Sequence, residues 1–258
     1  MKSAEATQSY ERAAAEFAAV VDESQVPRTS SLARLLLART RDRQERSQDV
    51  VDVLGPLVEA IRTETDGSHD EFAEALTLSA RSLLKLNRNE SAAELAKLFV
   101  ERFPKHDQIG DALASRALAE SRLQHLQEVE AALDRLWAEE STRALARRTT
   151  YQLAEHAYGE EAWKRAASHF ARLTTGGAGE FQTAALSGLE YSLHKWGGYA
   201  AAAQAFEQLV AANPGRELAA DAAHMRALSL RMAGELDAAA DAYVAAIRQF
   251  ALPAEKPD

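Results

Sequence analysis

The stretch from Leu186 to Pro214, LSGLEYSLHKWGGYAAAAQAFEQLVAANP, decides the fold. In its first half, apolar residues recur at helical spacing up to Gly197-Gly198. In its second half they recur again and stop at Asn213-Pro214. The apolar residues of the two halves are Leu186, Leu189 and Leu193, and then Tyr199, Ala202, Phe206, Leu209 and Val210. The stretch therefore predicts a helical hairpin with a tight glycine turn.

The same pattern recurs along the chain at intervals of 36 or 37 residues. If Tyr199 anchors the second helix of its hairpin, the equivalent anchors are Asn89, Leu126, Trp163 and Leu236. Apolar residues follow each anchor at 3, 7 and 10 positions, with Asn89, for example, followed by Ala92, Ala96 and Phe99. These offsets trace one face of a helix. A hairpin of this size cannot bury its own apolar face, so we expect each hairpin to stack on the next.

The repeated pattern resembles the tetratricopeptide repeat. The resemblance extends from about Asp70 to Phe250 and is carried by Leu186, Leu189, Leu193, Gly197, Tyr199, Ala202, Phe206, Leu209 and Pro214. It implies an all-α fold, a right-handed α-solenoid of about 13 helices. Two positions depart from the family pattern: Glu190 replaces a small residue of the first helix, and Asn89 replaces an aromatic anchor.

We predict one solenoid over residues 1–258, with five repeats at 70–250, divergent helices at 1–69 and a tail at 251–258. In the divergent part, second-helix spacing starts at Val50 after a first helix at about Ser31–Asp42, and again at Tyr10. Neither end carries the polar cap that solenoids generally need. Two explanations stay open: the chain is a piece of a longer protein, or its ends are covered by self-association or by adapted terminal helices.

The composition excludes several classes of protein. The chain has no cysteine, which excludes disulfides and cysteine-ligated zinc, and its net charge of −9 argues against nucleic-acid binding. No apolar run approaches the ~20 residues of a membrane span. We therefore expect a soluble protein, in the bacterial periplasm if a signal sequence was removed, or otherwise in the cytoplasm.

No motif points to catalysis, a metal or a cofactor. The glycines of Thr174–Phe181 do not match a phosphate-binding loop and predict an inter-repeat loop. The seven histidines lack zinc-site spacing and are expected at the surface or as caps. Arginines at 34–46 are interleaved with acidic residues, which favours a solvated helix face over an RNA site. We therefore expect no enzyme.

The resemblance also implies where a partner binds, because first helices line a concave groove in tetratricopeptide arrays. The groove positions of this chain are Tyr151, Glu155, Tyr158, Ser187, Tyr191, His194, Lys195, His224 and Arg231. An alternative is that Tyr151 and Tyr191 only pack between adjacent first helices. The peptide-carboxylate clamp of chaperone adaptors is absent, since its positions include Thr77, Arg81, Ala114 and Leu118.

The sequence thus predicts a non-enzymatic scaffold that binds a protein or peptide of unknown identity. The joint within Ala93–Leu123 resembles that of periplasmic repeat proteins of the outer-membrane assembly and Tol–Pal kind. A bacterial envelope assembly factor is therefore one alternative. Another is the regulatory or interaction portion of a larger enzyme or secretion-system protein.

Overall fold

The computed structural model describes residues 2–63, 70–211 and 216–250, which form thirteen α-helices and two short 3-10 helices and contain no strand. The predicted all-α class is confirmed. The helices are α1 (Lys2–Glu23), α2 (Pro27–Arg43), α3 (Ser47–Thr63), α4 (Asp70–Lys85), α5 (Asn89–Arg102), α6 (Ile109–Arg122), α7 (Leu126–Ala138), η1 (Glu140–Thr142), α8 (Arg143–Gly159), α9 (Trp163–Gly176), η2 (Gly179–Phe181), α10 (Gln182–Trp196), α11 (Tyr199–Ala211), α12 (Arg216–Met232) and α13 (Leu236–Phe250).

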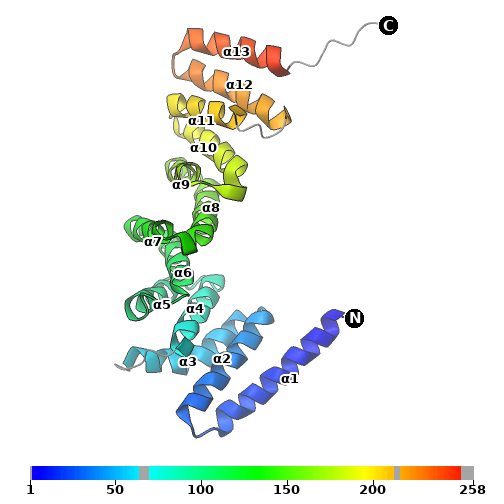
Figure 1. Cartoon of the computed structure of the whole chain (residues 1–258), viewed down its shortest axis with the longest axis vertical. Helices are drawn as coiled ribbons and strands as arrows, with labels where there is room; N and C mark the ends of the chain where they lie inside the picture. Colours follow the sequence, from blue (N-terminus) through cyan, green and yellow to red (C-terminus); the bar gives the residue numbers. More distant parts are fainter. Residues whose placement is uncertain (1, 64–69, 212–215, 251–258) are drawn as a thin grey trace. The chain divides into compact units, whose positions relative to one another are not determined.

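The chain divides into two compact units, residues 1–146 and 147–258, and the division falls within α8. In the first unit, α1 packs on α2, and three hairpins follow as the pairs α2–α3, α4–α5 and α6–α7 (Figure 1). The first helices α2, α4 and α6 also contact one another in sequence order. In the second unit, each helix from α9 to α13 packs on the next. The predicted series of stacked hairpins is confirmed within each unit.

The predicted repeat matches the helix boundaries. All five anchors (Asn89, Leu126, Trp163, Tyr199 and Leu236) are the first residues of their helices, α5, α7, α9, α11 and α13. The residues three positions after the anchors are buried in every repeat. At seven and ten positions, four of the five repeats bury the side chain, and Tyr243 and Ala246 of α13 are half-buried.

One backbone turn closes every hairpin. The residue two positions before each second helix has a positive φ, and the next N–H bonds to a carbonyl five residues back, as Gly198 does to Leu193 at 2.8 Å. This is the Schellman ending of a helix, which satisfies carbonyls that the helix leaves unpaired. The positive-φ residues of the six hairpins are Glu45, Asn87, Gln124, Glu161, Gly197 and Gly234. The turn predicted from the glycines of one hairpin thus recurs in all six, and in four of them the positive-φ residue is not glycine.

The turn also corrects the alignment of the first hairpin. Glu45 carries the positive φ and α3 begins at Ser47, so Ser47 is the equivalent of the anchors and not Val50. Val50, Leu54 and Leu57 then take the positions 3, 7 and 10 after the anchor, and all three are buried. The sequence alignment was displaced by three residues because the apolar face of α3 repeats with nearly the same spacing from either starting point.

The second unit is built around the aromatic residue seven positions after each anchor. Phe170 and Phe206 are fully buried, and Phe206 lies in a cluster with Leu186, Leu209 and Ala222. Phe170 occupies the space in which a side chain at Gly188 would stand, since a Cβ there would lie 2.3 Å from the ring. The close approach of α9 and α10 therefore requires glycine at position 188.

Candidate partner-binding surface

The predicted groove residues all lie in the second unit, on the first helices α8, α10 and α12. Eight of the nine fall at three offsets, 12, 8 or 5 positions before the anchor, and the ninth, Lys195, follows His194 directly. This spacing puts them along one face of each helix. We call these nine residues the first-helix strip. By helix, they are Tyr151, Glu155 and Tyr158 on α8, Ser187, Tyr191, His194 and Lys195 on α10, and His224 and Arg231 on α12.

The strip rests on the aromatic residues of the second helices. The ring of Tyr158 lies 6.5 Å from that of Phe170, and Tyr191 lies 6.4 Å from Phe206, with the rings nearly edge to face. His224 lies 5.8 Å from Tyr243. In each hairpin, therefore, an aromatic residue of the second helix packs against a strip residue of the first helix. These contacts restrict the orientation of the strip's rings.

Tyr158 lies within electrostatic reach of two other residues of the strip, Glu155 on its own helix and Tyr191 on α10. Burial raises the pKa of Tyr158, and Tyr191 and Glu155 raise it further. Burial likewise raises the pKa of Tyr151, and the neighbouring Glu155 carboxylate raises it further. Glu155 thus interacts with two phenol groups of its own helix, those of Tyr151 and Tyr158.

His194 connects α10 to α12. Its Nδ1 lies 3.3 Å from the Ser229 hydroxyl, and its ring packs 5.4 Å from Tyr199. Burial lowers the pKa of His194, and the adjacent Lys195 lowers it further. The imidazole is therefore held neutral near pH 7, which suits a hydrogen-bonding contact more than an ionic one.

The strip is open to solvent along part of its length. Tyr191 is 40% exposed, and Glu155, Lys195, His224 and Arg231 are exposed. Tyr151 is half-buried and stacks on Phe181 at 4.7 Å, as the packing alternative expects of it. That these residues bind a partner stays a prediction.

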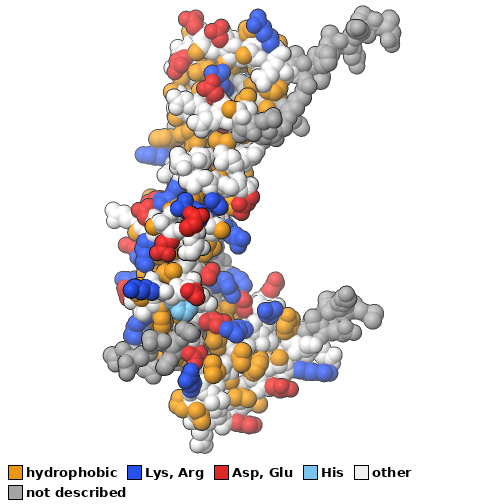
Figure 2. Space-filling model, viewed as in Figure 1, with side chains coloured by type: hydrophobic (Ala, Val, Ile, Leu, Met, Phe, Trp, Pro, Cys, Tyr) orange, Lys and Arg blue, Asp and Glu red, His pale blue; other side chains and the backbone are white. Residues whose placement is uncertain are grey.

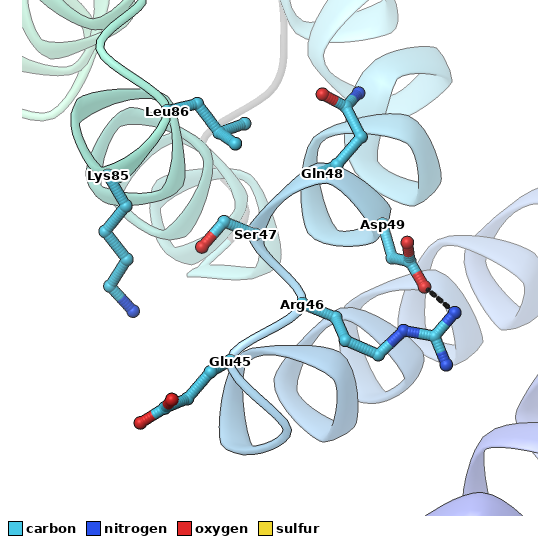
Figure 3. Close-up of a pocket in the computed structure, with 7 residues that line it drawn as sticks. All are labelled: Glu45, Arg46, Ser47, Gln48, Asp49, Lys85 and Leu86. Carbon is cyan, nitrogen blue, oxygen red and sulfur yellow. Dashed lines mark ion pairs between the residues drawn. The ribbon is translucent and has the colours of Figure 1, made fainter.

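The described residues also line cavities outside the strip, including one in each unit. One, of about 450 Å³, is lined by α9, α10 and α11, and Trp196 stands in it, 51% exposed and 5.3 Å from the Lys164 ammonium. The other, of about 650 Å³, lies in the first unit at the turn between α2 and α3, beside the end of α4 (Figure 3). There Arg46 pairs with Asp49 at 2.5 Å, so the charges that line it neutralise each other in part.

The arginine-rich segment is an ion-pair network, in keeping with the predicted solvated face. Arg39 pairs with Glu74, and Arg41 pairs with Glu11 at 3.0 Å, which ties α2 to α4 and α1. Asp42 accepts from Arg81 and Lys85 of α4 at 2.7 and 3.0 Å. On the face drawn in Figure 2, Lys and Arg side chains alternate with Asp and Glu rather than gathering by sign.

The expectation of surface histidines holds at His125, His156 and His224, which are exposed. His106 accepts a hydrogen bond from the Gln108 N–H in the turn before α6 and does not cap that helix. His169 is buried in α9, however, and burial with Arg165 and Arg172 lowers its pKa to about 4. His69 lies outside the described residues.

The glycine-rich segment is the predicted inter-repeat loop, because it joins α9 to α10 by way of η2. Over the described ranges, no group of three or more acidic or histidine side chains is arranged to hold a metal ion. Within those ranges, too, no helix combines the length and apolarity needed to cross a bilayer.

No protein-family model matches the chain, and no curated protein matches it either. Among solved structures, the chain is similar to a tetratricopeptide repeat protein from Parabacteroides merdae, with 17% identity, a TM-score of 0.47, and coverage of 96% of this chain and 95% of that one. A Podosopora anserina protein described as a kinesin light chain with nearly identical TPR-like repeats has 16% identity and a TM-score of 0.37, with coverage of 84% of this chain and 92% of that one. BtubC (BKLC) from P. vanneervenii has 14% identity and a TM-score of 0.40, with coverage of 96% of each chain.

Proposed function

We propose that the chain is a non-enzymatic interaction scaffold, and that its second unit binds a peptide or protein segment along the first-helix strip. The observation that supports this most directly is the mixture of open aromatic and polar side chains on one face of α8 and α10. Tyr191 presents a large ring to solvent while Phe206 holds it from below. Aromatic residues fixed in this way provide much of the affinity at protein interfaces.

Site-specific photo-crosslinking in an extract of the source organism tests the proposal. A benzophenone amino acid at Tyr191 should give discrete crosslinked products. The same amino acid at Val244, an exposed residue of the second helix α13, is the matched control and should give few. Equal crosslinking at both positions, or crosslinking only at Trp196 beside the second-helix cavity, would refute binding by the strip.

A further inference from the structure

A groove runs between the second helices α9 and α11, and α10 forms its floor. It is the cavity of about 450 Å³ in which Trp196 stands, and we call it the α9–α11 groove. Its lining extends from Lys164 in the first turn of α9 to Thr175 near the end of that helix, about 16 Å at 1.5 Å per residue. A groove of this length and volume is narrow, so it suits the side chains of an extended peptide segment better than a whole helix.

The next hairpin forms an equivalent groove, which the chain narrows with its own ion pair. That cavity, lined by α11, α12 and α13, has about 230 Å³, and two of its lining residues, Glu207 and Arg226, pair at 3.1 Å. Glu207 lies eight positions after its anchor, and Arg226 lies ten positions before the next anchor. In the α9–α11 groove these two positions hold Ala171 and Leu189, which cannot form an ion pair. The α9–α11 groove therefore keeps about twice the volume.

The α9–α11 groove combines an apolar floor with one positive charge. Leu189 and Leu193 line it, and beside them stands Trp196, the one exposed tryptophan of the three in the chain. Tryptophan is among the residues that contribute most to affinity at protein interfaces. Lys164 holds its ammonium 5.3 Å from the Trp196 ring and is the one charged residue among the described lining residues. The groove therefore favours an apolar side chain accompanied by an acidic one, and it disfavours a basic segment.

From this chemistry we infer a second docking surface, on which the α9–α11 groove binds an extended segment of a partner protein with a large apolar residue next to an acidic residue. The apolar side chain packs on Leu193 and Trp196, and the carboxylate pairs with Lys164 beside the same ring. Gln204 and Gln208 on the α11 side carry amides that can bond to the backbone of such a segment. None of the nine residues of the first-helix strip lines this groove, so the inference goes beyond the proposed function.

Selection from a displayed library of random peptides, with the full chain as bait, tests the inference. Peptides that also bind Trp196→Ala are removed first, which eliminates those captured by the first-helix strip. The remaining peptides should share a large apolar residue with an aspartate or glutamate at one fixed spacing. The Trp196 side chain is half exposed, so the melting temperature of Trp196→Ala should stay close to that of the wild type.

A charge exchange then tests the contact with Lys164 in a chain that keeps Trp196. Replacing the acidic residue of a selected peptide by lysine should weaken its binding to the wild type by about fivefold, the upper end for an exposed ion pair. The lysine form should bind Lys164→Glu more tightly than the acidic form does. Lys97→Glu, the same charge reversal at an exposed position of the second helix α5, is the matched control and should behave as the wild type. Fluorescence anisotropy gives the Kd values.

Several results would overturn this docking surface. They are the recovery of no Trp196-dependent peptide, a basic residue or no charge at the shared position, and a preference for the acidic form that survives Lys164→Glu. An equal change with Lys97→Glu would also overturn it, because the effect would then come from net charge. These results leave the first-helix strip untouched, since crosslinking at Tyr191 tests that surface separately.

Discussion

At the scale of single residues, Glu190 is the position where the chain departs most from its own repeat. The equivalent residues of the other four repeats are Ala80, Ala117, Ala154 and Ala227, all buried. Glu190 is 1% exposed, and its Oε2 has no hydrogen-bond partner among the described residues. Burial raises its pKa from 4.5 to about 9, so the side chain is neutral in the folded protein at pH 7.

This burial predicts a stability that falls as the pH rises. Between pH 4.5 and about 9 the unfolded chain has lost the Glu190 proton and the folded chain keeps it, so each unit of pH favours unfolding. We expect Glu190→Gln to match the wild type near pH 5 and to exceed it at pH 8 by on the order of 3 kcal/mol. Urea unfolding at both pH values measures this, and parallel pH profiles would contradict it.

Gly188 gives a second prediction at the same scale. A Cβ at this position would lie 2.3–2.6 Å from carbons of the Phe170 ring. Gly188→Ala should therefore destabilise by about 1–3 kcal/mol, despite the better helix propensity of alanine. Phe170→Leu in the same chain should recover part of the loss in a double-mutant cycle. Additive effects of the two substitutions would show that the contact is not the cause.

At the scale of elements, the recurring turn explains why the hairpins share one geometry despite different residues. Gln124 and Glu161 adopt φ values of 63° and 57°, at which a Cβ is strained, while Gly197 and Gly234 adopt 90° and 85° without that cost. Only two of the six turns carry glycine, so glycine marks this turn poorly in the sequence. The spacing of the apolar residues in the helices predicted the positions of the turns better than the residues of the turns themselves did.

The turn predicts substitutions of opposite sign at equivalent positions. Gln124→Gly should stabilise the chain by roughly 0.5–1 kcal/mol, because the folded turn is relieved of strain. Gly234→Ala should destabilise it by about 1 kcal/mol for the converse reason. Thermal unfolding of the two variants is the measurement. A shift in the same direction for both would mean that the turns are not equivalent.

At the scale of the whole molecule, stacked hairpins predict that damage stays local. Phe206→Ala removes the centre of the cluster with Leu186, Leu209 and Ala222 and should cost about 3–5 kcal/mol. Contacts in a repeat array run between neighbours, so hydrogen exchange should rise in α10 to α12 and stay unchanged in α2 to α5. Uniform acceleration along the chain would contradict a nearest-neighbour array.

Self-association, one of the two explanations that the sequence leaves open for the uncapped ends, is also tested at this scale. The last helix, α13, exposes Leu236, Val244 and Ile247, the last of these to 65%. If this face joins two copies, the sedimenting mass of the wild type should rise with concentration, and Ile247→Glu should remain at the monomer mass. Gln249→Glu, an equal change of charge on the same helix, is the control. A monomer at every concentration would rule self-association out.

The sequence by itself determined the hairpins, their length and their buried faces. Offsets of 3, 7 and 10 from each anchor reflect the 3.6-residue turn of a helix, and repetition makes every hairpin evidence for the others. Repetition predicts poorly where a hairpin departs from the common pattern. The alignment at Val50 was displaced in the least regular hairpin, and Glu190 is a buried carboxyl group at a position where the other repeats have alanine.

Only the tertiary structure decided which side chains meet. The sequence could not show that His169 is buried or that Phe170 fills the space over Gly188. Nor could it show that Tyr191 of one hairpin lies within electrostatic reach of Tyr158 of another. Periodicity specifies the face of a helix on which a residue lies. Contacts between hairpins depend on how closely and at what angle the helices pack. The side-chain volumes of several repeats jointly determine these distances and angles.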